Sequence, residues 1–260
     1  MKARKVVLTA GILGLLLIWL ILTPSGLLGK SDAVGYSVCH RFPGHSYYLG
    51  ERPLSLCARC TGEFLAVLAG VVVRAALGGR RQGFPRRGFL AVLAFLALFF
   101  VIDGINSVLS QYMHQSTGFL YPPANILRLA SGVGMGLAVS GVIYPLANQV
   151  IWRGERPGAV LSNIWHELVF LASGGLIIAL IDSRNPLFLY PLTLLSTAGI
   201  ILLLSGAYTL ILIIMREREN TFLSGKELFW CWMGGFGIAL LQIAIINWLR
   251  YSLTGTWSGF

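Results

Sequence analysis

Seven long apolar runs, separated by short polar segments, make up most of the chain. They cover about residues 6–22, 61–77, 89–112, 124–146, 164–181, 187–215 and 228–249. Each run is long enough for a helix that crosses the hydrocarbon core of a bilayer, which takes about 20 residues. The pattern therefore predicts an all-α fold, a polytopic transmembrane bundle of about seven helices that forms one integral membrane domain over residues 1–260.

The first run follows a basic segment, Met1 to Lys5, as the core of a secretory signal would. It is longer than the usual signal core of about 7–15 residues, and Thr23 to Gly26 offers no small-x-small cleavage pattern. We therefore expect residues 6–22 to remain in the protein as its first transmembrane helix.

The composition excludes a soluble domain. Hydrophobic residues make up 56% of the chain and charged residues 12%, against roughly 25% charged in an average soluble protein. The formal charge of +10 would suggest nucleic acid in a soluble protein, but here the basic residues lie in short clusters between apolar runs. Such clusters set the orientation of membrane proteins, so we expect membrane lipid as the surroundings and no nucleic-acid partner.

The distribution of lysine and arginine predicts which side each loop faces. One side collects 13 of these residues and the other side collects 6, with Arg128 left inside a span. The richer side includes the N-terminus and the segments 74–87, 153–156 and 216–226. Because basic residues are enriched in cytoplasmic loops, we expect a cytoplasmic N-terminus and an ordered extracytoplasmic loop over residues 30–60.

This outer loop concentrates ligand-type side chains between two apolar runs. Cys57 and Cys60 form a C-x-x-C turn, and Cys39 and His40 lie further upstream. Three thiolates and one imidazole are a ligand set that zinc binds in tetrahedral geometry. We therefore predict a metal site, with zinc as the expected ion, at Cys39, His40, Cys57 and Cys60, and with His45 as an alternative fourth ligand.

Two other interpretations of these cysteines remain open. An outer loop lies in an oxidising compartment, so Cys39 could form a disulfide with Cys57 or Cys60 that staples the loop. Alternatively, Arg59 beside the C-x-x-C thiols would lower their pKa, which suits a membrane thiol-disulfide oxidoreductase that passes electrons to quinone. The fourth cysteine, Cys231, is expected near the opposite face and too far away to pair with the loop.

Polar residues inside the third and fourth runs form a second candidate feature. The predicted topology places Asp103 in the outer half of the third run, and Asn125 and Arg128 near the outer end of the fourth. An ionisable residue inside a span costs about 2.5–3.5 kcal/mol on insertion scales, so such residues usually face the bundle interior and are paired. We expect Asp103 and Arg128 either to form a structural ion pair or, with Asn125, to bind an anionic headgroup or transfer a proton.

The fourth run also carries a stripe of small residues, because Gly132, Gly136 and Ser140 follow one another at four-residue spacing. Such a stripe lets a neighbouring helix approach closely. We therefore predict that another helix packs tightly against this face.

The sequence resembles domain-of-unknown-function family 2085, a group of prokaryotic membrane proteins, at Cys39-His40, Ser46-Tyr47, the segment LCARCTG (residues 56–62), Asp103-Gly104, Asn125, Arg128, Gly132 and Gly136. The resemblance covers about residues 39–136 and implies a multi-pass protein of a prokaryotic plasma membrane. The chain departs from the family pattern at His45, where arginine is common, and at Glu63, where an aliphatic residue is common.

These predictions combine into one composite site at the outer face. Its metal ligands are Cys39, His40, Cys57 and Cys60, and its catalytic residues are Asp103, Asn125 and Arg128. We expect it to act on a lipid-linked or small anionic substrate. The alternatives are the quinone-coupled oxidoreductase and a non-enzymatic transporter or assembly subunit, in which a disulfide-stapled loop serves only as a rigid lid.

Overall fold

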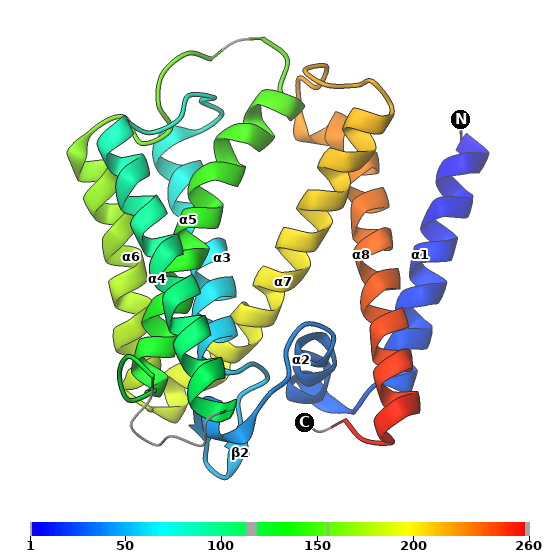
Figure 1. The fold of residues 1–260 in the computed structure, drawn as a ribbon. Coiled ribbons are helices and arrows are strands. Elements are labelled where there is room, and N and C mark those ends of the chain that lie inside the picture. The colour runs from blue at the N-terminus through cyan, green and yellow to red at the C-terminus, as the bar shows by residue number, and fades with distance from the viewer. Residues whose placement is uncertain (1, 113–118, 155, 258–260) are drawn as a thin grey trace.

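A computed structural model of the chain describes residues 2–112, 119–154 and 156–257, which are mostly helical (Figure 1). The helices are α1 (Lys2–Leu22), α2 (Gly26–Tyr36), α3 (Ala58–Gly78), α4 (Arg87–Tyr112), α5 (Asn125–Ile151), α6 (Ile164–Asp182), α7 (Pro186–Met215) and α8 (Gly225–Thr254). A short 3-10 helix, η1 (Pro43–His45), and a hairpin of β1 (Tyr48–Leu49) and β2 (Arg52–Pro53) lie between α2 and α3. All the α-helices except α2 are long and apolar enough to cross a membrane, which confirms the predicted all-α bundle of seven spans.

The helices run back and forth between two ends of the bundle (Figure 1). The chain begins at the end that also holds the α3–α4, α5–α6 and α7–α8 connections, here termed the N-terminal end. α2, the β-hairpin and the last turn of α8 lie at the opposite end, termed the cysteine end because the predicted ligand loop lies there. The connections therefore alternate between the two ends in the order that the apolar runs predict.

α3 packs directly along α5 through small residues. A Cβ atom on Gly132 would lie 2.0 Å from the carbonyl oxygen of Arg59, and one on Gly136 would lie 2.1 Å from that of Glu63. Only glycine permits this approach of one backbone to another. The predicted stripe is therefore confirmed, and it fixes the first turns of α3 against α5.

Buried apolar side chains form two main clusters. The first, which includes Leu65, Leu129 and Phe170, lies among α3, α5 and α6. The second, which includes Trp19 and Ile243, lies among α1, α2, α7 and α8, and the three cysteines between α2 and the first turn of α3 pack into it or against it. α3 also contributes residues to the first cluster, so the start of α3 lies between the two clusters.

Two features of the fold differ from the sequence prediction. Residues 26–36 form the helix α2, although residues 30–36 were expected to belong to the polar loop. Arg74 lies inside α3 with its side chain fully buried, and its guanidinium lies 4.6 Å from the ring centroid of Phe170. The expectation that Arg128 is the one basic residue left inside a span is therefore wrong.

Candidate functional site

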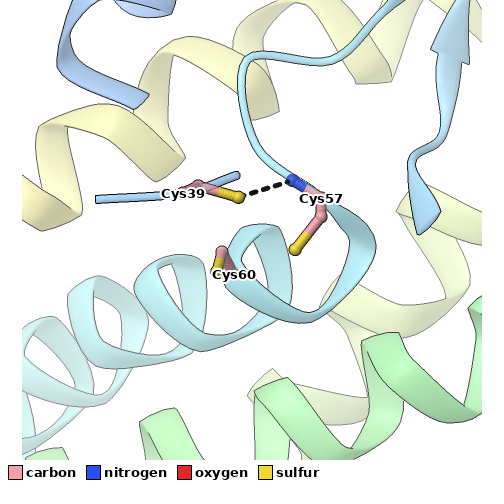
Figure 2. Close-up of side chains that lie close together, drawn as sticks. All are labelled: Cys39, Cys57 and Cys60. Atoms are coloured by element: carbon pink, nitrogen blue, oxygen red, sulfur yellow. Dashed lines mark hydrogen bonds between the residues drawn. The ribbon is translucent and has the colours of Figure 1, made fainter. Parts of the chain in front are cut away.

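The three cysteines of the loop meet at the start of α3 (Figure 2). Cys39 follows α2, Cys57 is the N-cap residue of α3, and Cys60 lies in the first turn of α3. Their Sγ atoms all lie within 4.8 Å of one another. Sulfur ligands of one tetrahedral zinc ion are about 3.8 Å apart, given a Zn–S distance of about 2.3 Å. Small shifts would therefore bring all three sulfurs onto a single ion.

Hydrogen bonds favour a thiolate at Cys39. The backbone N–H groups of Arg41 and Cys57 both donate to Cys39 Sγ, each with an N···S distance of 3.4 Å. Figure 2 shows the bond from Cys57. Arg41 has a φ of 51°, a left-handed conformation that accompanies this turn back toward the sulfur. Hydrogen bonds from the Cys57 and Cys60 thiols, with those N–H groups, hold the pKa of Cys39 far below its usual value. The hydrogen bond to Cys39 raises the pKa of Cys57 to about 11.

Packing and a hydrogen-bonded arginine bring Cys39 to the C-x-x-C turn. A Cβ atom on Gly35 would lie 2.1 Å from the carbonyl oxygen of Ser55, so the end of α2 contacts the segment just before α3. Arg250, near the end of α8, donates to the carbonyl oxygens of Tyr36 and Cys39, at 3.0 Å for the latter. Its guanidinium also lies 4.1 Å from the ring centroid of Tyr36.

Asp32 of α2 ties together the segments on both sides of the cysteine cluster. It forms salt bridges with Arg41, at 3.1 Å, and with Arg52 of β2, and it accepts a hydrogen bond of 2.7 Å from Ser55 Oγ. Both Asp32 and Arg41 are largely buried. Asp32 was not among the predicted site residues, although its contacts set the geometry of the loop.

All four cysteines are free in the structure. In this structure the Asp32 network and Arg250 hold the loop without a disulfide. Cys231 is buried in the first turns of α8, at the N-terminal end of the bundle, as the sequence predicts.

A cavity of about 780 Å³ opens beside the cysteine cluster and is lined by all three of these cysteines together with His40 and His45. His40 is exposed and His45 is half-buried. Burial, and then the nearby guanidiniums of Arg128 and Arg59, lower the pKa of His45, which favours the neutral imidazole at pH 7. Both predicted imidazole ligands therefore border the same cavity as the sulfurs, although neither belongs to the group of ligand atoms within 4.8 Å.

Arg59, inside the C-x-x-C turn, connects the cluster to α4. Its Nη2 atom lies 2.5 Å from Asp103 Oδ2. The Asp103 side chain is 1% exposed and also accepts hydrogen bonds from Tyr121 Oη, at 3.1 Å, and Ser131 Oγ, at 3.0 Å. The salt bridge of Asp103 is therefore with Arg59, and the expected ion pair with Arg128 is wrong.

Arg128 and Asn125 contact each other one turn apart on α5. Arg128 Nη1 donates to Asn125 Oδ1 at 2.9 Å, and Asn125 Nδ2 donates to the carbonyl oxygen of Ser46 at 3.3 Å. Asn125 lines a second cavity, of about 410 Å³, with Tyr47 and Arg184. The segment 42–46 separates the two cavities, because some of its residues line the first cavity and the others line the second. The predicted cysteine ligands border the first cavity and Asn125 borders the second.

Sequence reasoning missed the partner of Asp103. The available signal was that a carboxylate inside a span needs a cation, and two arginines were candidates. Arg59 was considered only for its effect on the neighbouring thiols, because it was placed in a loop. In the structure Arg59 lies in the first turn of α3, where it reaches both Asp103 and Ser107 of α4.

Residues 39–142 match the model of a protein family described as "Predicted membrane protein (DUF2085)". The match spans the cysteine cluster, α3, α4 and most of α5, and it confirms the resemblance noted in the sequence. Comparison of the chain with curated proteins gave no match, and neither did comparison with solved structures. The family description and the seven apolar helices agree that this is an integral membrane protein.

Proposed function

We propose that this membrane protein binds a metal ion, with zinc as the expected ion, through Cys39, Cys57 and Cys60. The observation that carries the proposal is the convergence of three sulfurs within 4.8 Å at the wall of a cavity. Two backbone N–H groups already donate to one of these sulfurs, and such outer contacts orient and tune metal ligands. Thiolates are ligands that zinc takes in both structural and catalytic sites.

The fourth ligand would come from the cavity. Either His40 or His45 would complete a set of three cysteines and one histidine, which is an established zinc-binding set. A water or substrate oxygen in that position would instead give three protein ligands and one open place, as in catalytic zinc sites. With such an open place, zinc supplies Lewis-acid chemistry by polarising the oxygen bound to it.

A small anionic or lipid-linked substrate fits the rest of this cavity. Arg41 and Arg59 line it together with the two histidines, and its described lining residues include no carboxylate. Val38, Phe42 and Val108 also line it, and each of these side chains is more than a third exposed. Positive charge beside exposed apolar surface suits an anionic group attached to a hydrocarbon chain.

The predicted catalytic residues then have distinct roles. Arg59 faces the negative charge of the substrate, and Asp103, which does not line the cavity, holds the Arg59 guanidinium in place. Arg128 adds a second positive charge close to His45. Asn125 positions Arg128 through the hydrogen bond between their side chains.

Metal analysis of the purified full-length protein tests this proposal. We expect about one zinc ion per chain, as for a single site of three thiolates. Cys57→Ser and Cys60→Ser should each lose the metal. Cys231→Ser is the matched control, since it removes a buried thiol at the other end of the bundle, and it should keep the metal. A wild-type protein without stoichiometric metal, or equal metal in all variants, would contradict the proposal.

The position of the C-x-x-C turn favours a second candidate function. Cys57 and Cys60 lie at the start of a helix, and Cys39, the sulfur at which a thiolate is favoured, lies beside them. Thiol-disulfide exchange, the chemistry of thiol-disulfide oxidoreductases, begins with such a thiolate next to a second pair of sulfurs. In that reaction two thiols form a disulfide, and their two electrons and two protons reduce a quinone to a quinol. Thiol trapping in cells separates the candidates. A redox-dependent mixture of free and bonded cysteines supports the oxidoreductase, whereas thiols that become reactive only after chelation support the metal site.

A further inference from the structure

An apolar groove lies between α3, α5 and α7, in the half of the bundle away from the cysteine cluster. Its volume is about 520 Å³, within the range of roughly 300–1,000 Å³ that is typical of ligand sites. Val67 and Val71 of α3, Ile143 of α5, and Leu202 and Leu210 of α7 form much of its wall. Nothing in the proposed metal chemistry uses this groove.

Polar side chains in the wall are already bonded to the protein itself. Ser140 Oγ donates to the carbonyl oxygen of Leu137 at 3.0 Å, and Tyr144 Oη donates to that of Gly79 at 2.7 Å. A polar ligand that entered this part of the groove would lose hydrogen bonds to water and gain few in return. The walls therefore favour hydrocarbon.

The length of the groove matches one leaflet of a bilayer. Along α3 it runs from Val67 to Gly79, which corresponds to about 18 Å at a rise of about 1.5 Å per residue. The hydrocarbon core of a bilayer is about 30 Å thick, so one leaflet contributes about 15 Å. A groove that starts at the end of a spanning helix and reaches about the midplane suits an extended acyl chain.

Arg80 is the one basic residue among the described residues that line the groove, and it lies where the groove reaches the N-terminal end of the bundle. Arg80 lines the groove together with Trp152, and the Arg80 guanidinium lies 3.6 Å from the ring centroid of Trp152. Arg80 Nη1 also donates to the carbonyl oxygen of Leu223 at 2.8 Å, which fixes the side chain at this end. The three connecting segments at the N-terminal end contain seven arginines against three glutamates, so the surroundings are positive as well. Arginine binds phosphate groups well, and basic pockets between membrane helices bind anionic headgroups.

We propose that this groove is a binding site for an anionic phospholipid, with one acyl chain between α5 and α7 and the phosphate on Arg80. The site is separate from the metal centre and does not depend on the proposed metal function. Its lipid would also fill the space between the part of the bundle that matches the family and the C-terminal helices α7 and α8.

Native mass spectrometry of the detergent-purified full-length chain tests the proposal, with phosphatidylglycerol and phosphatidylcholine of identical acyl chains as the two probes. We expect phosphatidylglycerol to bind more tightly. Arg80→Gln should weaken its binding about fivefold, because one arginine near a headgroup contributes about 1 kcal/mol. Arg81→Gln removes the same charge from an exposed residue that does not line the groove, so it should weaken binding much less than Arg80→Gln.

A second variant tests the acyl-chain part of the site. A Cβ atom on Gly206 would have no neighbour closer than 3.9 Å, and Gly206 lines the groove, so the ring of Gly206→Phe is expected to occupy the groove. We expect it to reduce binding of both lipids while the protein stays folded. Equal binding of the two lipids by the wild-type protein, equal effects of Arg80→Gln and Arg81→Gln, or unchanged binding in Gly206→Phe would overturn the proposal.

Discussion

Arg59 and Asp103 form a salt bridge of 2.5 Å that joins the C-x-x-C turn to α4. The Asp103 side chain is 1% exposed and that of Arg59 is 20% exposed. Because Arg59 lies between Cys57 and Cys60, the ion pair restrains the turn that carries both sulfurs. The ion pair therefore couples the geometry of the thiol cluster to α4.

Asp103→Asn should strongly destabilise the protein. The change keeps the size of the side chain but leaves the Arg59 guanidinium without its counter-ion, and breaking a buried pair in this way costs about 3–5 kcal/mol. Thermal unfolding in detergent measures the loss, and zinc affinity should fall at the same time. The matched control is Asp182→Asn, since Asp182 is an exposed carboxylate that accepts a hydrogen bond from Tyr47. Similar unfolding temperatures for the two variants would exclude this structural role for the ion pair.

The metal-free protein should keep a thiolate at Cys39 well below the usual pKa of a cysteine, which is about 8.5. Hydrogen bonds from Cys57 and Cys60 lower the pKa of Cys39, so the anion persists as the pH falls from 9 to about 6 and is lost only in stronger acid. The ultraviolet absorption of the thiolate, followed during an acid titration, measures the pH at which the anion is lost. Cys39→Ser should abolish the absorption that remains at about pH 6, whereas Cys231→Ser should retain it. Retention in Cys39→Ser would show that the anion lies elsewhere.

Sequence alone was sufficient for the bundle because the bilayer imposes it. A run such as 187–215 must form a helix, since no other single-chain element satisfies its own backbone hydrogen bonds in hydrocarbon, and α7 covers almost the same residues. The contact of α3 with α5 was also predictable, because glycines at four-residue spacing mark a face that another backbone can approach. The short helix α2 lacked any such signal, as its residues are neither apolar throughout nor clearly periodic.

The site was harder to predict because its contacts depend on how each helix is rotated. α4 has no distinct polar face, so its sequence does not show which neighbour Asp103 contacts, and only Arg128, expected inside the next span, was predicted as its partner. The convergence of the three cysteines followed from their spacing and residue type. The contacts that hold them in place, made by Asp32 and Arg250, join segments too distant in sequence for one chain to reveal.

One of the two histidines at the cavity should complete the coordination of the metal. Cobalt substitution reports this, because the visible absorption of a bound cobalt ion changes when a nitrogen ligand is lost. We expect either His40→Ala or His45→Ala to alter the spectrum, and His166→Ala, a change at the opposite end of the bundle, to leave it unchanged. Unaltered spectra in both cavity variants would indicate a fourth ligand from solvent or substrate.

Gly132→Ala should destabilise the protein and weaken metal binding together. Its new Cβ atom would lie 2.0 Å from the carbonyl oxygen of Arg59, so α5 would have to move away from the C-x-x-C turn. Forcing extra atoms into a packed interface costs about 1–3 kcal/mol. Gly175→Ala on α6 is the control, because its Cβ atom would meet nothing within 4 Å. That control should be neutral or stabilising, by up to about 1 kcal/mol, through better helix propensity. Equal stability of the two variants would contradict the tight α3–α5 contact.

Arg74→Met should stabilise the protein. The Arg74 side chain is fully buried, and none of its three guanidinium nitrogens has a hydrogen-bond partner in the structure, so the ring of Phe170 is its main compensation. A buried charge without a counter-ion is costly, and apolar residues that replace buried charges often raise stability by about 1–4 kcal/mol. We therefore expect a higher unfolding temperature for Arg74→Met in detergent.

The same substitution at Arg86, Arg86→Met, should lower the stability of the protein, whereas Arg74→Met should raise it. Arg86 forms a salt bridge of 2.6 Å with Glu167, whose side chain is 3% exposed, so Arg86→Met would leave a buried carboxylate unpaired. We expect its unfolding temperature to fall while that of Arg74→Met rises. Both variants remove one positive charge from the half of the bundle away from the cysteines. Opposite changes in the unfolding temperature therefore cannot arise from the change in net charge. A lower unfolding temperature for Arg74→Met would instead mean that an anion, such as a bound phosphate, pairs with this guanidinium in the membrane.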